Sequence, residues 1–246
     1  IQLGARFDDN DDFGQHSSWR VSVFQPLSQS LPLAVTAAAG TGFRAPSLYE
    51  IAYNNGPFAF SPASDLPLTE ETSRGWEVGL RWDDDFAQLN VVWFTQALED
   101  EIYFDLNSYA GYLQRPGSHD SEGLEIEGTL VVQAWSLSGN LTWNDTEDAQ
   151  GQQRPYRPKL TSAMTLSWQN ERFASALTTR LARDSVDTSG APMPDYVVVD
   201  LAGTAVLTDQ LSLTARVENL TDDDYQQVQG YYTAGGRYFL GLRPTY

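Results

Sequence analysis

Residues 134–143 read AWSLSGNLTW, and in this stretch apolar side chains recur at every second position. Trp135, Leu137, Leu141 and Trp143 share one face, whereas serine, asparagine and threonine occupy the other. A period of two is that of a β-strand, because successive side chains point to opposite sides of a pleated backbone. The stretch therefore predicts a strand with one apolar and one polar face.

The same alternation recurs along the chain, for example at residues 76–82 and 211–217, whereas helical spacing of apolar residues is hard to find. We predict twelve strands, at residues 1–9, 17–27, 31–42, 72–82, 86–104, 111–131, 134–144, 158–168, 172–184, 193–207, 210–220 and 235–246. The predicted fold class is therefore all-β and antiparallel. Such strands occur both in soluble β-sandwiches and in membrane barrels.

Two features favour an antiparallel transmembrane β-barrel over a sandwich. Aromatic residues stand at both ends of the apolar runs, as Trp76 and Trp82 do, with aliphatic residues between them. Eight tilted residues span about 19 Å, which is most of an apolar band about 25 Å tall that is flanked by aromatic girdles. The opposite face carries serine, threonine and asparagine with occasional arginine and glutamate, and these suit a wet lumen better than a sandwich core.

The predicted connections alternate between short and long, as they do in outer-membrane barrels with short periplasmic turns and long extracellular loops. The short ones fall at residues 28–30, 83–85, 133, 169–171 and 208–209. The long ones fall at residues 10–16, 43–71, 105–110, 145–157, 185–192 and 221–234. We therefore expect an integral protein of the outer membrane of a Gram-negative bacterium, in contact with outer-membrane lipid and with its C-terminus in the periplasm.

The composition argues against several other classes of protein. The 246 residues carry a formal charge of -18 and no cysteine, which excludes disulfide scaffolds, thiolate zinc sites and thiol nucleophiles. The acid excess argues against nucleic-acid binding, which needs cationic side chains to neutralise phosphates. The two histidines, His16 and His119, are expected near opposite ends of the barrel, so no Ser-His pair is predicted. We therefore predict that the protein is not an enzyme and has no catalytic residues.

Three segments resemble the TonB-dependent outer-membrane receptors. Residues 40–50 read GTGFRAPSLYE, similar to the GFRAPS-type motif at the entry to a long extracellular loop. Residues 66–78 read LPLTEETSRGWEV, similar to the family's return into the barrel. Residues 217–236 read VENLTDDDYQQVQGYYTAGG, which resembles the NLxDxxY box and the GYxTAGR loop, most closely those of the vitamin B12 receptors. The terminal Tyr246 resembles the aromatic signature through which outer-membrane proteins contact the barrel assembly machinery.

The resemblance implies a barrel of about 22 strands closed around a plug domain, of which about twelve strands are visible here. Residues 1–246 are then expected to be the C-terminal half of the barrel domain, with the plug domain and the TonB box absent from this chain. A free-standing barrel of about twelve strands is the alternative, which strand number alone permits.

The implied function is TonB-dependent active transport of a large, scarce nutrient, with cobalamin as the favoured small-molecule ligand and with capture by extracellular loops. TonB is expected to act through the missing N-terminal plug. A ferric-siderophore receptor of the same family is one alternative. An autonomous passive pore or surface barrel of twelve strands is another.

The candidate ligand-binding residues lie in or beside the predicted extracellular loops. By the resemblance, Tyr231 holds the position at which B12 receptors present a ligand-facing tyrosine, and Arg183 and Arg157 match arginines near that ligand. In the 43–71 loop, aromatic rings and amides are suited to a large amphipathic ligand. The candidates in that loop are Tyr53, Asn55 and Phe58. The alternative for Tyr231 is a place in the outer aromatic belt.

A calcium site in an extracellular loop is suggested by Asp8, Asn10 and Asp12, which place oxygen ligands on alternate residues. The EF-hand pattern fails because Phe13 stands where glycine is needed, and a solvated hairpin loop is the alternative. No other metal and no cofactor is predicted. Four lumen-facing charges are expected to pair across the wall or to meet the plug, because unpaired charges in a crowded interior are costly. They are Glu77, Arg81, Asp200 and Arg216.

Overall fold

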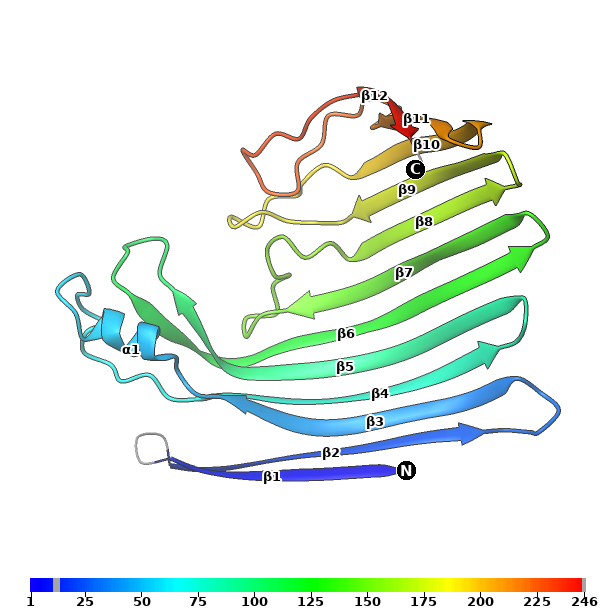
Figure 1. Cartoon of the computed structure of the whole chain (residues 1–246). Helices are drawn as coiled ribbons and strands as arrows, with labels where there is room; N and C mark the ends of the chain where they lie inside the picture. The colour runs from blue at the N-terminus through cyan, green and yellow to red at the C-terminus, as the bar shows by residue number, and fades with distance from the viewer. Residues whose placement is uncertain (11–13, 245–246) are drawn as a thin grey trace.

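The computed structural model describes residues 1–10 and 14–244. These residues form one antiparallel sheet of twelve strands, in which each strand pairs with the next one along the chain (Figure 1). The strands are β1 (Gln2–Asn10), β2 (Gly14–Pro26), β3 (Leu33–Arg44), β4 (Glu71–Asp83), β5 (Ala87–Phe104), β6 (Tyr112–Val132), β7 (Trp135–Glu147), β8 (Leu160–Gln169), β9 (Phe173–Arg183), β10 (Tyr196–Thr208), β11 (Leu211–Glu218) and β12 (Arg237–Pro244). The predicted all-β, antiparallel fold is confirmed, and each predicted strand corresponds to an observed one.

The register sorts the side chains onto two faces, because residues directly opposite each other in an antiparallel pair point to the same side. Trp143 lies opposite Leu124 and Leu160, and Leu124 lies opposite Trp93, so one row of apolar residues crosses four strands. Thr142, the preceding residue on β7, instead lies opposite a glutamate on β6 and a threonine on β8. The predicted alternation is therefore continuous across the sheet, and it defines an apolar face and a polar face.

The apolar face is exposed rather than packed against other protein. Trp76 and Trp135 remain 50% and 51% exposed, and the buried apolar residues are few and mostly small, such as Ala34 and Val198. A soluble sandwich covers such a face with a second sheet, whereas all the described strands belong to one sheet. The sandwich is therefore excluded, and hydrocarbon is the environment that suits this face.

The connections alternate in length as predicted, and the two kinds lie at opposite ends of the sheet (Figure 1). The short connections are residues 27–32, 84–86, 133–134, 170–172 and 209–210. Among the described residues, the long ones are 45–70, 105–111, 148–159, 184–195 and 219–236, and we call the end that they occupy the long-loop end. β2 begins at Gly14, earlier than the predicted residue 17, so the predicted 10–16 loop is shorter than expected.

One helix was not predicted. It is α1 (Leu48–Asn54), which lies within the 45–70 connection. Its start is fixed by a capping box, in which the Ser47 hydroxyl accepts from the Glu50 backbone N–H and the Glu50 carboxylate accepts from the Ser47 N–H. The Ser-x-x-Glu spacing that signals this cap is present in the sequence.

The expectation that the two histidines lie near opposite ends of the sheet is wrong. His16 lies near the start of β2 and His119 near the start of β6, and both strands begin at the long-loop end. Both strands start at the long-loop end and end at a short connection. A residue in the first part of either strand therefore lies toward the long-loop end. The two histidines are nevertheless four strands apart in the sheet.

None of the helices among residues 1–10 and 14–244 has the length and apolar character needed to cross a membrane.

Close strand packing makes glycine necessary at Gly123, on the polar face. A Cβ atom on Gly123 of β6 would overlap the Trp143 carbonyl oxygen and lie 2.8 Å from the Phe94 ring. By contrast, a Cβ on Gly203 of β10 would approach no nearer than 3.7 Å to the Ala174 carbonyl oxygen. Gly123 is therefore a structural requirement of the wall, and Gly203 is not.

Candidate functional site

An aromatic cluster occupies one side of the long-loop end. Tyr49 and Tyr53 of α1 pack against Phe104 and Tyr112, which flank the connection between β5 and β6, and Phe104 in turn contacts Tyr109 within that connection. The Tyr53 ring lies 5.4 Å from that of Phe104 and 5.7 Å from that of Tyr112, both nearly perpendicular, which is a favoured geometry for aromatic pairs. Tyr49 and Tyr109 remain mostly exposed, so the cluster offers aromatic surface to a ligand.

α1 is held against β6 by an amide of the 43–71 segment that serves the fold. Asn54 is buried, and its side chain donates to the Tyr112 carbonyl and accepts from the Tyr112 N–H, both at 2.8 Å. Its neighbour Asn55, the predicted ligand residue, is exposed and ends the helix. Phe58 is also exposed. Tyr53, Asn55 and Phe58 all lie in the 45–70 connection, on this side of the long-loop end.

The base of the same connection is fastened by ionic contacts. Arg44, the last residue of β3, donates to Glu50 at 3.1 Å and to Glu71 at 2.5 Å, and Glu71 also accepts from the Ile102 N–H at 2.6 Å. Burial alone raises the pKa of Glu50, but hydrogen bonds from Ser47 and Arg44 outweigh it, so the pKa lies below its usual value. The connection that carries α1 is therefore anchored to β3, β4 and β5.

A cleft of about 330 Å³ lies elsewhere at the long-loop end, between the connections 148–159, 184–195 and 219–236. Arg183 lines it directly, together with Tyr156, Pro158, Met193, Tyr196, Gln226 and Val228. Arg157 stands between two of these residues in the chain, and the Tyr231 N–H donates to the Val228 carbonyl at 3.1 Å. We call this the arginine cleft; of the three predicted residues, Arg183 lines it, whereas Arg157 and Tyr231 are near lining residues in the chain but are not part of the lining.

Arg183 and Tyr231 differ in what surrounds their side chains. Arg183 lies opposite Leu160 and so continues an apolar row at its loop end, and its exposed side chain lines the same cleft as Asp195. Tyr231 and Tyr232 are both largely exposed. Ligand contact by Arg157, Arg183 and Tyr231 stays a prediction, as does contact by the residues of the aromatic cluster.

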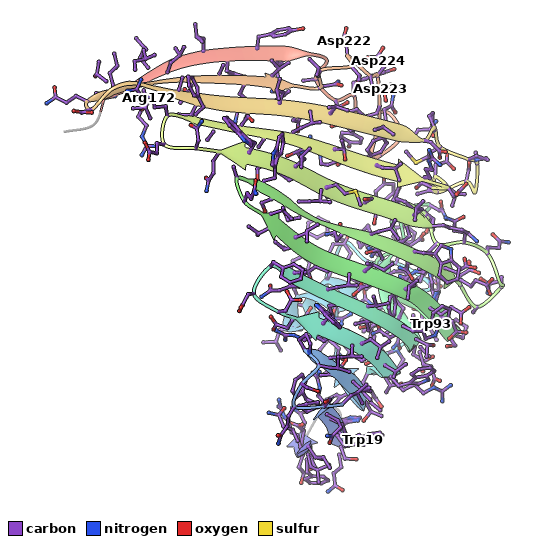
Figure 2. All side chains as sticks on the ribbon, turned by 90° about the vertical axis from the view of Figure 1, so that its right-hand side faces the viewer. Trp19, Trp93, Arg172, Asp222, Asp223 and Asp224 are labelled. Atoms are coloured by element: carbon purple, nitrogen blue, oxygen red, sulfur yellow. The ribbon has the colours of Figure 1, made fainter. Side chains whose placement is uncertain are left out.

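The 219–236 connection is ordered by one buried side chain, Asn219. Its amide donates to the Asp223 carbonyl at 2.9 Å, and its oxygen accepts from the Asp223 N–H at 3.0 Å. Its own N–H donates to Asp200 at 2.9 Å, which ties the connection to β10. Asp222 accepts from the Gly236 N–H at 2.7 Å. Figure 2 shows residues 222–224 at the end of the sheet opposite Arg172, which lies in a short connection.

The predicted lumen charges behave in three ways. Asp200 pairs across the wall with Arg180 at 2.7 Å, as expected. The two arginines instead pair along their own strands, Arg81 with Asp83 at 2.7 Å and Arg216 with Glu218 at 3.0 Å. Glu77 has no ion-pair partner in the described part of the chain, and it lines a groove of about 520 Å³ on the sheet with Arg20 and Glu125.

Sequence inspection missed a second ionic group, around Glu101. Arg154 donates to Glu101 at 2.5 Å, and Arg115 and His119 lie 3.7 and 3.8 Å from its other oxygen. His119 is buried, and neither ring nitrogen has a hydrogen-bond partner among residues 1–10 and 14–244. Because Arg154 is 53 residues from Glu101, no local pattern signals the pair.

The calcium prediction remains a prediction. Asp8 accepts from Arg6 at 2.9 Å, so a cation of the protein already occupies one side of this carboxylate. Asp12 and Phe13 lie outside the described residues, as does Tyr246. Among residues 1–10 and 14–244, no group of three potential metal-ligating side chains is present.

A single antiparallel sheet with an exposed apolar face, a polar face and long connections at one end is the wall of a transmembrane β-barrel. The family model described as "TonB dependent receptor-like, beta-barrel" matches residues 1–220, so the chain belongs to this family of Gram-negative outer-membrane barrels. Members of the family bind small ligands and interact with TonB.

The relatives with the most informative names are vitamin B12 transporters. The chain is 28% identical over 247 residues to the vitamin B12 transporter BtuB of Vibrio vulnificus, and the match covers 98% of this chain and 38% of that protein. It is 24% identical to BtuB of Photobacterium profundum, covering 96% of this chain and 39% of that protein. The chain therefore spans about two fifths of these relatives, which are transporters rather than enzymes.

Solved structures of siderophore receptors share the fold. The siderophore receptor PirA from Acinetobacter baumannii has a TM-score of 0.76 at 17% identity, covering 99% of this chain and 43% of that one. The ferric enterobactin receptor PfeA from Pseudomonas aeruginosa, in complex with enterobactin, has a TM-score of 0.75 at 20% identity, covering 98% and 42%. At these identities the likeness shows the fold alone.

Proposed function

We propose that this chain forms the ligand-capturing wall of a longer TonB-dependent receptor that carries cobalamin across the outer membrane. The observation that carries the proposal is the arginine cleft, which Arg183 lines; Arg157 lies between two lining residues in the chain, and Tyr231 is hydrogen-bonded through its backbone to a third. These residues come from the end of β9 and from two separate connections, and they are the ones that the resemblance to B12 receptors singles out. The names of the relatives with 28% and 24% identity support the same ligand.

The remainder of the receptor is proposed to lie outside this chain. The matched relatives are more than twice as long, and β1 and β12 each pair on one side only among the described residues. Further strands would satisfy the free backbone groups at both edges, which hydrocarbon does not tolerate unpaired. The plug domain and the segment that contacts TonB belong to the same missing part.

Transport is proposed to begin with capture at the long-loop end, on the extracellular side. The aromatic cluster and the arginine cleft hold the ligand, and TonB then rearranges the plug so that the ligand passes through the barrel. The apolar face lies against outer-membrane lipid, the C-terminus is periplasmic, and Tyr246 is read by the barrel assembly machinery.

The first test is calorimetry of the complete receptor with cobalamin and, separately, with ferric siderophores. We expect cobalamin to bind, and Tyr231→Ala to weaken binding at least about tenfold, since truncation of a central aromatic contact costs about 2 kcal/mol or more. Tyr232→Ala is the matched control, because it is also a largely exposed tyrosine, one residue away. If a ferric siderophore binds and cobalamin does not, the proposed ligand is wrong and the siderophore alternative is supported.

The pore alternative is tested by conductance in a planar bilayer. A stable open channel formed by this chain alone would contradict the proposal that it is part of a larger receptor.

A further inference from the structure

The long-loop end carries few cations. Four of its five long connections, residues 45–70, 105–111, 184–195 and 219–236, contain neither lysine nor arginine. The carboxylates of the five connections are Glu50, Asp65, Glu70, Asp105, Asp148, Asp184, Asp187, Asp195, Asp222, Asp223 and Asp224. The only cations of these connections, in 148–159, are Arg154, Arg157 and Lys159.

Most cations at this end are neutralised by carboxylates of the protein itself. Arg44 is shared between two glutamates, Arg154 pairs with Glu101 at 2.5 Å, and Lys159 pairs with Asp145 at 2.7 Å. Arg237, which follows the last long connection, pairs with a β11 glutamate at 2.5 Å. These cations therefore contribute little net positive field toward a ligand.

Two arginines at the long-loop end have no carboxylate within ion-pair distance in the described part of the chain. They are Arg183, which lines the arginine cleft, and Arg157, which lies between the lining residues Tyr156 and Pro158 in the chain. Asp195 lines the same cleft and Asp184 follows Arg183 in the chain, so the cleft holds as many acids as cations. The cleft is therefore close to neutral, within a surface that is acidic as a whole.

The acidic charge of this surface persists at neutral pH. Hydrogen bonds from the Ser108 hydroxyl and the Asn107 N–H lower the pKa of Asp105. The Ser189 hydroxyl and N–H do the same for Asp187. Both carboxylates stay ionised because their negative form accepts these bonds.

We infer that the capture surface takes a bulky ligand that is neutral or cationic and discriminates against one that carries several negative charges. The inference rests on the proposed function and narrows its ligand. The exposed rings of the aromatic cluster contribute apolar and stacking contacts that need no ligand charge. A ferric tris-catecholate, which is trianionic, meets repulsion here, whereas cyanocobalamin and a ferric trihydroxamate, which are neutral, do not.

The test measures binding of three probes to the complete receptor at about 20 mM and about 300 mM NaCl, concentrations between which the Debye length falls severalfold. The probes are cyanocobalamin, a neutral ferric trihydroxamate and a trianionic ferric tris-catecholate. We expect the trianion to bind at least about tenfold more weakly than a neutral probe at low salt and to gain affinity as salt rises. The neutral probes are expected to show little salt dependence.

Three variants assign the effect to this surface. Asp184→Asn and Asp224→Asn each remove a charge from an exposed side chain at the long-loop end, and together they are expected to strengthen trianion binding about threefold or more. Asp209→Asn makes the same change in an exposed short connection, at the other end of the sheet, and is expected to change nothing.

The possible outcomes separate this inference from the cobalamin assignment. Binding of the neutral hydroxamate but not of cobalamin would support the charge selection and reject cobalamin. The inference is overturned if the trianion binds as tightly as the neutral probes, if its affinity falls with salt, or if neither neutral probe binds.

Discussion

Truncation of Asn219 to alanine should loosen the whole 219–236 connection. The change removes the two hydrogen bonds to Asp223, at 2.9 and 3.0 Å, from a side chain that is 4% exposed. Each such bond is worth about 0.5–1.5 kcal/mol. Asn219 also has a left-handed backbone with φ 51°, where alanine costs about 1 kcal/mol more than asparagine. The sum is about 2–4 kcal/mol of local opening free energy.

Hydrogen exchange read by mass spectrometry measures this opening directly. Protection of peptides within residues 219–236 should fall by about 30-fold to about 1000-fold, since 1.4 kcal/mol corresponds to about tenfold. Cobalamin affinity should fall with it, because Tyr231 loses its fixed position. Asn219→Asp keeps the acceptor oxygen and loses the amide donor, so its effect should be intermediate.

Unchanged exchange in Asn219→Ala would refute the assignment of Asn219 as the residue that orders this connection. An equal loss of protection in residues 45–70 would also refute it, because it would mean general destabilisation of the barrel rather than local opening.

Three further predictions concern the loops and the wall. Glu71→Gln should destabilise the 45–70 connection by about 2–3 kcal/mol, because the buried carboxylate loses its charge opposite an arginine; hydrogen exchange of that connection tests this. The pKa of Asp187 is lowered, so its contribution to loop order is complete above its ordinary pKa of 3.8 and is lost as the pH falls through the lowered value. Exchange of the Ser189 amide between about pH 2 and about pH 6 should show this loss, and Asp187→Asn should abolish the dependence. Gly123→Ala should reduce the yield of assembled barrel, because the added methyl group overlaps neighbouring atoms. Gly203→Ala, which has room for a methyl group, should leave the yield unchanged. Heat-modifiable mobility on gels measures the yield of assembled barrel.

The wall was predictable from sequence because its signal is local. In a strand, the face of each residue follows from its neighbours two positions away, so Trp135 to Trp143 suffices to set the register of polar and apolar rows. In a membrane barrel one side of the wall faces lipid and the other faces a wet lumen. Apolar and polar residues therefore alternate along nearly every strand. The strand boundaries accordingly agree with prediction to within a few residues.

The loop architecture was less accessible because its contacts are distant in sequence. Asn54 bonds to Tyr112 across 58 residues, and Arg154 reaches Glu101 across 53. Loop composition makes Asn55 a candidate ligand residue, yet the neighbouring Asn54 is the buried amide that anchors the helix. Only the arrangement of the side chains shows which of the two amides is buried. α1 itself carried a local signal, the Ser47-to-Glu50 capping box, that a search for period-two patterns overlooked.

Energised uptake tests the central claim most directly. Cells that express the complete receptor as their only B12 receptor are given radiolabelled cobalamin, with functional TonB or without it. We predict accumulation that requires both the receptor and TonB and that Tyr231→Ala reduces at limiting cobalamin. Accumulation independent of TonB, or none beyond that of cells lacking the receptor, would contradict the account.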